Sequence, residues 1–256
     1  MTDCGKFTGD PESYRELVYS RYASAFSGEA SAIRGTSAAN WSRAYDYYLR
    51  GWLPFDHAAR IADLGCGSGR LLSFLSQRGY SNLVGVDRSP EQAAIARQSG
   101  AAVVEGGAYE FLVSSAGSID VLLAIDLVEH FQKREVLPFL TACLGALSPG
   151  GRLIVQTPNG ESPFCGTLLY GDFTHEWCYS ASLLRNLLSF VGFEGGEARE
   201  VGPVPFGYGV KATMRSGGWA FLRLLCGVWS LLETGNMGSR VWTRAMLVSA
   251  RKKGLP

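Results

Sequence analysis

Three glycines at alternate positions constrain this chain more than any other feature. They stand in "RIADLGCGSGRLLSFLSQRG", Arg60 to Gly79, between a short apolar run and a leucine-rich helical pattern. Glycine weakens both strands and helices, because it has no side chain to pack and loses the most backbone freedom on ordering. Gly65, Gly67 and Gly69 therefore indicate a sharp strand-to-helix turn where a ligand lies against main-chain N–H groups.

The surrounding pattern alternates short apolar runs with segments of helical periodicity. Continuously apolar strands are typical of a parallel sheet that is buried on both faces, so the chain is predicted to be α/β and doubly wound. Ser89 before Pro90 indicates a helix start, and "SPGG" is expected to end the last of the helices before Arg152. The expected strands are 60–64, 82–87, 101–105, 119–126, 151–157 and, last, 244–252, and the expected helices are 69–79, 89–100, 108–117 and 131–151.

Two ligand classes use a glycine turn of this kind, dinucleotides and adenosyl compounds. The dinucleotide pattern is G-x-G-x-x-G, whereas here the third glycine comes one residue early and Arg70 stands at the expected position. Asp63 precedes the turn, and a carboxylate suits a cation, such as the amino group of a methionyl moiety, better than a pyrophosphate. The pattern favours an adenosyl compound.

"IADLGCGSG", followed by Asp87 at the end of "LVGVD", resembles the cofactor site of class I S-adenosylmethionine-dependent methyltransferases. "IDLVEHF" and "LSPGGRLIVQTPN" resemble later motifs of that family, and the likeness covers roughly 60–194. It implies a mostly parallel, seven-stranded, Rossmann-like sheet and S-adenosylmethionine as the cofactor, with Asp87 on the ribose hydroxyls. The implied cofactor-binding residues are Asp63, Gly65, Cys66, Gly67, Gly69, Asp87, Arg88, Gly107, Ala108, Asp126, Leu127 and His130, with Gly107 where many members carry an acid that reaches the adenine.

A second segment, "YGDFTHEW" from Tyr170 to Trp177, carries the expected catalytic groups. Methyl transfer is an in-line displacement, and a hydroxyl acceptor profits from a base. We expect His175 to be that base, because imidazole titrates near neutrality, and Asp172 to orient it. The alternative is that His175 only holds the loop by hydrogen bonding.

Asp126, Glu129 and His130 resemble the E-x-x-E-H segment of the ubiquinone-pathway O-methyltransferases, which has been linked to a divalent cation. Two carboxylates and an imidazole can hold a hard metal that polarises a substrate oxygen. Alternatively, His130 lines the cofactor pocket. We expect no metal here.

The acceptor is suggested by a weaker likeness. The run from Gln156 to Glu194 resembles methyltransferases associated with bacterial polysaccharide and glycolipid assembly, which implies a hydroxyl of a sugar or glycolipid as the acceptor. The alternatives are a small aromatic or natural-product acceptor, or a cofactor-binding scaffold without turnover at a membrane-bound assembly. Nucleic acid is not an expected partner, since no N-P-P-Y or D-P-P-Y type segment follows the fourth strand.

Charge is unevenly distributed along the chain. From Val210 onward eight basic residues face one acid, a net charge of +7, while the rest of the chain carries −6. An apolar helix is expected at Trp219–Glu233 within this basic region, and 211–233 can bind a membrane surface. Packing on its own core, or on a second subunit in a homodimer, is the favoured alternative.

The predicted organisation is a methyltransferase core at 56–202 and 241–253, an aromatic-rich lid at 1–55 and an apolar, basic insertion at 203–240. Tyr14 and Tyr22 would share one helical face of the lid. Six cysteines without a CxxC pair favour reduced thiols, and neither a signal peptide nor a membrane span is expected. These features predict a cytoplasmic protein, at the inner face of the membrane if the basic helix binds it.

Overall fold

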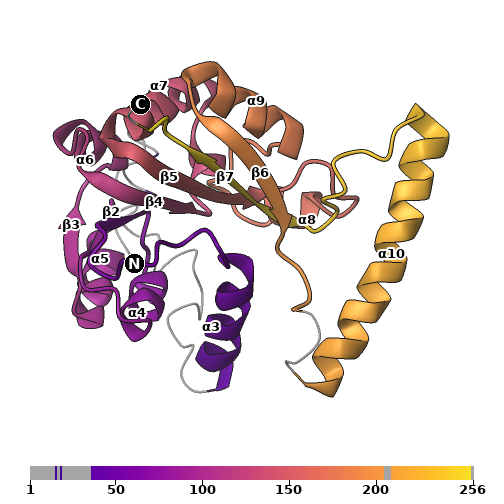
Figure 1. Ribbon diagram of the computed structural model, residues 1–256, viewed down its shortest axis with the longest axis horizontal. Coiled ribbons are helices and arrows are strands. Elements are labelled where there is room, and N and C mark those ends of the chain that lie inside the picture. Colours follow the sequence, from indigo (N-terminus) through magenta and orange to yellow (C-terminus); the bar gives the residue numbers. More distant parts are fainter. Residues whose placement is uncertain (1–14, 16–17, 19–35, 205–208, 255–256) are drawn as a thin grey trace, which may run out of the picture.

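A computed structural model describes residues 15, 18, 36–204 and 209–254 of the chain. Its sheet has seven strands in the order β3-β2-β1-β4-β5-β7-β6, and β7 runs antiparallel to both of its neighbours (Figure 1). This confirms the predicted α/β, mostly parallel, seven-stranded architecture. The strands are β1 Ile61–Leu64, β2 Leu83–Asp87, β3 Ala102–Glu105, β4 Ile119–Ile125, β5 Leu147–Pro158, β6 Glu194–Glu200 and β7 Ala245–Arg251.

Helices cover both faces of the sheet, as buried parallel strands require. Successive strand residues point to opposite faces, so Ile61 packs in one core cluster and Ala62 in the other. The first cluster lies under α3, α4 and α5, and the second under α6, α7 and α9. The helices are α3 Thr36–Tyr48, α4 Arg70–Gln77, α5 Pro90–Ala96, α6 Ala108–Ser114, α7 Lys133–Ala146, α8 Gly166–Leu169, α9 Ala181–Val191 and α10 Val210–Thr234, with 3₁₀ turns η2 Arg97–Ser99 and η3 Val128–His130.

Two element boundaries differ from their predictions. The helix expected to reach 151 ends at Ala146, and β5 begins at Leu147, so the "SPGG" turn lies inside the strand segment. Strand β6, "EGGEARE", was not predicted, because it lies at the edge of the sheet beside β7 and has no buried residue. The helix start at Ser89 is confirmed, with the serine hydroxyl accepting from Gln92 N and Pro90 in the first turn.

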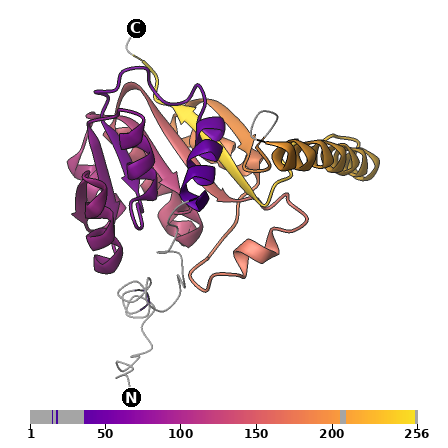
Figure 2. The same cartoon turned by 90° about the horizontal axis from the view of Figure 1, so that it is seen from below.

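The aromatic residues expected in a lid fall into two groups. Tyr45, Tyr48 and Trp52 are buried in the core cluster beneath α3 and α4. Tyr14 and Tyr22 lie outside the described residues, and the lid expected at 1–55 stays a prediction. The expected apolar insertion contains α10, which stands away from the sheet beyond β6 and β7 (Figures 1 and 2).

Among the glycines of the cofactor turn, Gly69 has a structural role that can be tested. Its φ is +74°, and a Cβ atom there would lie 2.8 Å from Ala96 Cα, at the packing of α4 against α5. Gly100 has a similar φ of +82° and open space around it. Both alanine variants have backbone strain, but only Gly69→Ala also overpacks. Denaturant unfolding should show Gly69→Ala to be less stable than Gly100→Ala by about 1–3 kcal/mol; equal stability would contradict this account.

Candidate active site

A cavity of about 810 Å³ opens at the carboxyl ends of β1, β2, β3 and β4. The strand order reverses here, since β1 lies between β2 and β4, and ligands bind at such switch points in open α/β sheets. The cavity is lined by Arg15, Gly65, Gly67, Val86, Asp87, Arg88, Ser89, Gln92, Gly106, Gly107, Ala108, Tyr109, Glu110, Asp126, Leu127, His130, Phe131, Arg134, Glu135, Pro138 and Phe139.

The glycine turn forms one wall of this cavity. Asp87 holds it in place, because its carboxylate accepts hydrogen bonds from Gly67 N and Ser89 N, both at 2.8 Å. Gly67 has a φ of +52°, and a Cβ atom placed there would meet no atom within 4 Å. A side chain would therefore extend into space that a ligand can occupy. The bare backbone beside a carboxylate fits the sugar and amino-acid parts of an adenosyl cofactor.

Nine of the twelve residues predicted to bind the cofactor line the cavity, and Asp63, Cys66 and Gly69 do not. Asp63 is 2% exposed and lies behind the turn. The Cys66 sulfur packs against the backbone of Gly85, where a Cβ atom would come within 2.8 Å of it. Together with Gly69, which packs on α5, these residues shape the turn from behind.

Burial changes the acidity of both carboxyl groups next to the turn. It raises the pKa of Asp63 to about 8, and the neighbouring Asp87 contributes to the rise. The pKa of Asp87 is also raised by burial, although the two N–H donors oppose the shift. At neutral pH Asp63 is therefore mostly protonated, and a cation bound nearby would favour its ionised form.

Three residues of the site were not singled out from the sequence. Gln92 lines the cavity, and its Oε1 atom is buried with no hydrogen-bond partner among the described residues, so it can accept a bond from a ligand. Gln156 donates from Nε2 to both oxygens of Asp126, at 3.0 and 3.1 Å. Tyr45 in turn donates to Gln156 Oε1 at 2.9 Å, which ties α3 to the cavity wall.

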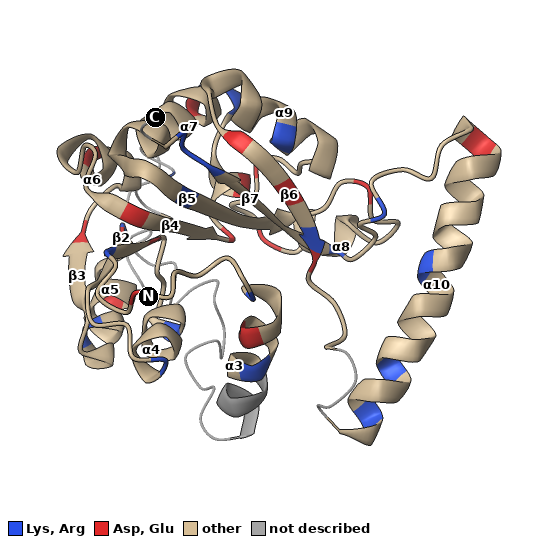
Figure 3. Cartoon of the chain, viewed as in Figure 1, with Lys and Arg blue, Asp and Glu red and all other residues tan. Residues whose placement is uncertain are grey.

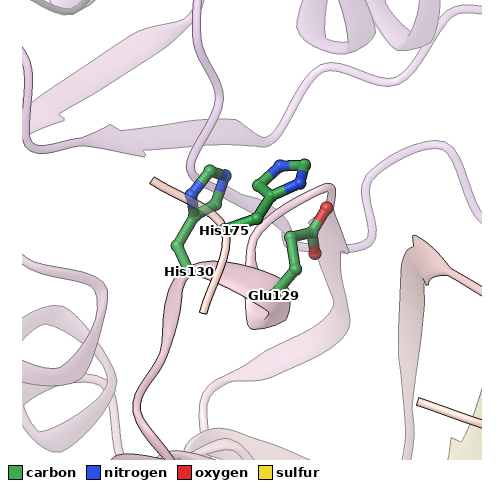
Figure 4. Close-up of side chains that lie close together, drawn as sticks. All are labelled: Glu129, His130 and His175. Atoms are coloured by element: carbon green, nitrogen blue, oxygen red, sulfur yellow. The ribbon is translucent and has the colours of Figure 1, made fainter. Parts of the chain in front are cut away.

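Beside the cavity, Glu129, His130 and His175 bring one ligand atom each to within 4.8 Å of one another (Figure 4). The imidazole rings of His130 and His175 meet edge to face, with their centroids 4.8 Å apart. Glu129 is buried, and its Oε2 atom has no hydrogen-bond partner among the described residues. The loop that carries His175 is held here, because the amides of Glu176 and Trp177 both donate to the Glu129 carbonyl.

The two histidines differ in their environments. Burial and the adjacent His175 lower the pKa of His130 to about 4, so His130 is neutral at physiological pH. His175 Nδ1 lies 2.9 Å from the carbonyl of Leu168 and must donate to it, which leaves its Nε2 atom free to accept a proton.

The expected partner of His175 is bonded elsewhere. Asp172 accepts hydrogen bonds from the amide and the hydroxyl of Thr174, at 2.8 and 2.6 Å. The same hydroxyl lies 2.8 Å from His130 Nδ1. A backbone carbonyl therefore orients His175 through Nδ1, while Asp172 supports His130 through Thr174. His175 itself does not line the cavity, but its ring contacts that of His130, which does.

The residues that could together hold a metal ion in the structure differ from those of the sequence motif. Asp126, expected in it together with Glu129 and His130, is hydrogen-bonded to Gln156, and His175 takes its place in the cluster. One carboxylate and two imidazoles suit a transition ion such as zinc better than magnesium. Burial raises the pKa of Glu129 well above its usual range, and the nearby Asp126 contributes to the rise.

Comparison with known proteins identifies the central part of the chain. Residues 62–155 match the family model described as a methyltransferase domain. The chain carries a methyltransferase domain. A solved structure titled a SAM-dependent methyltransferase, from Archaeoglobus fulgidus, superposes with a TM-score of 0.60 at 18% identity over 84% of this chain and 92% of that one. The match confirms the predicted methyltransferase fold.

Two further matches are to proteins named as methyltransferases. A Haemonchus contortus phosphoethanolamine N-methyltransferase 2 complex with S-adenosylhomocysteine aligns over 93% of this chain and 60% of that one, with a TM-score of 0.63 at 15% identity. Ubiquinone biosynthesis O-methyltransferase of Cereibacter sphaeroides is 31% identical over 139 residues, 52% of this chain and 55% of that protein. The chain thus spans about half the length of such relatives. Together with the methyltransferase-domain match, these findings agree with the predicted S-adenosylmethionine cofactor.

The raised pKa of Asp63 predicts that cofactor binding releases a proton. The positive charge of S-adenosylmethionine lowers the pKa of Asp63 from about 8, so affinity should increase as the pH rises from 6 to 8. Calorimetry in buffers of different ionisation enthalpy measures the proton release. The Asp63→Asn variant should bind S-adenosylmethionine with an affinity that does not change between pH 6 and 8. Equal proton release by both proteins would rule out Asp63 as the source.

Proposed function

We propose that this protein transfers a methyl group from S-adenosylmethionine to a hydroxyl group, with His175 as the general base. The observation that carries the proposal is the fixed tautomer of His175: Nδ1 donates to the Leu168 carbonyl, and Nε2 is left to accept a proton beside the cavity-lining His130. The cofactor supplies an electrophilic methyl group, and the residues of the chain position the acceptor and receive its proton.

A sugar or glycolipid is the proposed source of that hydroxyl. The loop between β5 and α9 resembles methyltransferases of polysaccharide and glycolipid assembly, and it presents aromatic side chains to solvent. Phe164, Tyr170 and Phe173 are 64, 85 and 71% exposed. Aromatic faces beside a base suit the apolar face of a sugar ring. They also suit a small aromatic acceptor, which is the alternative that an acceptor panel tests.

His175→Ala is expected to lower kcat by about 10²- to 10⁴-fold, since it removes the proton acceptor. Calorimetric affinity for S-adenosylmethionine should stay unchanged, because His175 does not line the cofactor cavity. His57→Ala is the matched control, since His57 packs on Tyr80 outside that cavity. Radiolabelled methyl transfer to nucleotide sugars, glycolipids and phenols gives the rates. Unchanged turnover of His175→Ala would contradict the assigned base.

The same assay separates proton transfer from metal catalysis. We propose a metal-independent reaction, so dialysis against a chelator should leave the parent rate unchanged. Glu129→Gln removes a ligand from the cluster but preserves its shape. Loss of activity on chelation, restored by added zinc or manganese, would instead assign the cluster of Glu129, His130 and His175 to a cation.

Helix α10 is proposed as the surface that pairs two copies of this chain. Its side toward the sheet carries polar and small residues: Trp219 donates to Glu200 at 3.0 Å, Arg223 pairs with Glu200 at 3.4 Å, and Gly227 is buried. Its outer side is apolar, the reverse of an ordinary surface helix. The exposed apolar residues are Val210, Met214, Phe221, Leu222, Leu224, Leu225, Val228, Trp229, Leu231 and Leu232.

The spacing of these residues favours another helix as the partner. Met214, Phe221 and Val228 follow each other at seven-residue intervals, as do two leucine pairs in neighbouring rows, Leu224 with Leu231 and Leu225 with Leu232. A seven-residue apolar repeat is typical of paired helices.

The charges of α10 favour an antiparallel second copy. Lys211 and Arg215 lie near one end and Glu233 near the other (Figure 3). A two-fold antiparallel pair brings these opposite charges together. Among the described residues no helix combines the length and the apolar character needed to cross a bilayer.

Phe221→Glu combined with Leu225→Glu should convert a dimer to a monomer in sedimentation experiments, because two buried charges per helix oppose pairing. Both positions are exposed in one chain, so the variant should keep its unfolding temperature as a monomer. Lys253→Glu, beyond β7, controls for charge. A parent protein that sediments as a monomer and co-sediments with anionic vesicles would assign α10 to a membrane and contradict the dimer.

A further inference from the structure

A second cavity, of about 330 Å³, lies between α3, the end of β6 and α10. It is separate from the cofactor cavity, with which it shares no lining residue. We propose that it binds the phosphate or diphosphate group of the acceptor, an inference that rests on the proposed methyl transfer and deepens it. Its lining residues include Tyr47, Tyr48, Arg50, Arg199, Glu200, Trp219, Arg223 and Arg240.

Basic residues outnumber acidic ones in the wall of this cavity. Four arginines line it, Glu200 is the sole acid among its lining residues, and Glu197 just outside the lining pairs with Arg199 at 3.4 Å. The carboxylate of Glu200 already accepts bonds from Trp219 Nε1 and Trp242 N, both at 3.0 Å, and lies 3.4 Å from Arg223. Burial and the nearby Arg50 lower the pKa of Arg199, as expected where cations outnumber anions. Guanidinium groups are suited to phosphate because they donate two parallel bonds to its oxygens.

Arg240 is the strongest single indication. Its φ is +61°, in the left-handed region that favours glycine, and its side chain makes no hydrogen bond or ion pair with any described residue. Of the described non-glycine residues only Asp126, with a φ of +53°, shares this conformation, and Asp126 lines the cofactor cavity. Strained backbone of this kind concentrates at binding sites, where it aims a side chain. Here Arg240 is one of the residues that line the second cavity.

The position of the cavity fits an acceptor that reaches from one site to the other. Both cavities lie at the carboxyl edge of the sheet, and α3 lines the second and reaches the first through hydrogen bonds. Tyr45 is bonded through Gln156 to Asp126 of the cofactor cavity, and Tyr48 lines the second cavity. Tyr45 and Tyr48 are three residues apart on α3, about 4.5 Å along the helix axis, so neighbouring turns of one helix contact the hydrogen-bond chain to Asp126 and the second cavity.

Calorimetric titration of the full chain with inorganic pyrophosphate, at low salt and with S-adenosylmethionine present, tests the site. Arg240→Gly and Arg223→Ala should each weaken pyrophosphate binding by about tenfold, since each removes a charge-assisted contact. Arg240→Gly also relieves the backbone, so its unfolding temperature should be equal or higher. Arg97→Ala is the matched control, because Arg97 and Arg223 are 49 and 48% exposed and each lies near a glutamate.

The outcomes separate this site from the methyl transfer itself. Asp87→Ala should lose S-adenosylmethionine binding and keep the arginine-dependent binding of pyrophosphate. Competition by vesicles containing phosphatidic acid would assign the phosphate to a lipid-linked acceptor, and a lack of competition to a soluble one. A parent that does not bind pyrophosphate, or variants that bind it as the parent does, would overturn the proposal even if methyl transfer is observed.

Discussion

The carboxylate of Asp87 is the contact on which the rest of the site depends. It ends β2 and accepts hydrogen bonds from the backbone of two separate turns, at Gly67 after β1 and at Ser89 before α5. Each oxygen keeps a further lone pair, so the group can bind a ligand while it holds the turns. The glycine turn thereby stays open toward the cavity instead of folding over it.

The sheet was predictable where burial on both faces determined the residues. In β1 and β4 almost every position is buried, and the resulting apolar runs mark these strands within one or two residues. Strand β6 could not be found in this way, because it pairs with β7 alone and exposes most of its side chains. The predicted end of α7 differs from the observed one for a related reason. Leu147 is buried, and a buried apolar residue fits the end of a helix as well as the start of a strand.

The cofactor cavity was largely predictable, because its residues follow strand ends that lie at one edge of a parallel sheet. The arrangement around His175 was not. Hydrogen bonding between Thr174, Asp172 and His130 depends on how the loop after β5 folds back onto η3, and the sequence contains no local signal for that contact. Gln156 could have been noticed as a polar residue near the end of an apolar strand, since such positions face the ligand edge.

The two described non-glycine residues with a left-handed backbone are stabilised in different ways, and each of them lines one of the two cavities. Asp126 is held by a continuous set of bonds, because Gln156 donates to it and Tyr45 donates to Gln156, so the surrounding structure offsets its strain. Arg240 has no comparable support among the described residues. The strain at Arg240 therefore costs free energy in the free protein, and a ligand that pairs with its guanidinium supplies the contact that Asp126 already has.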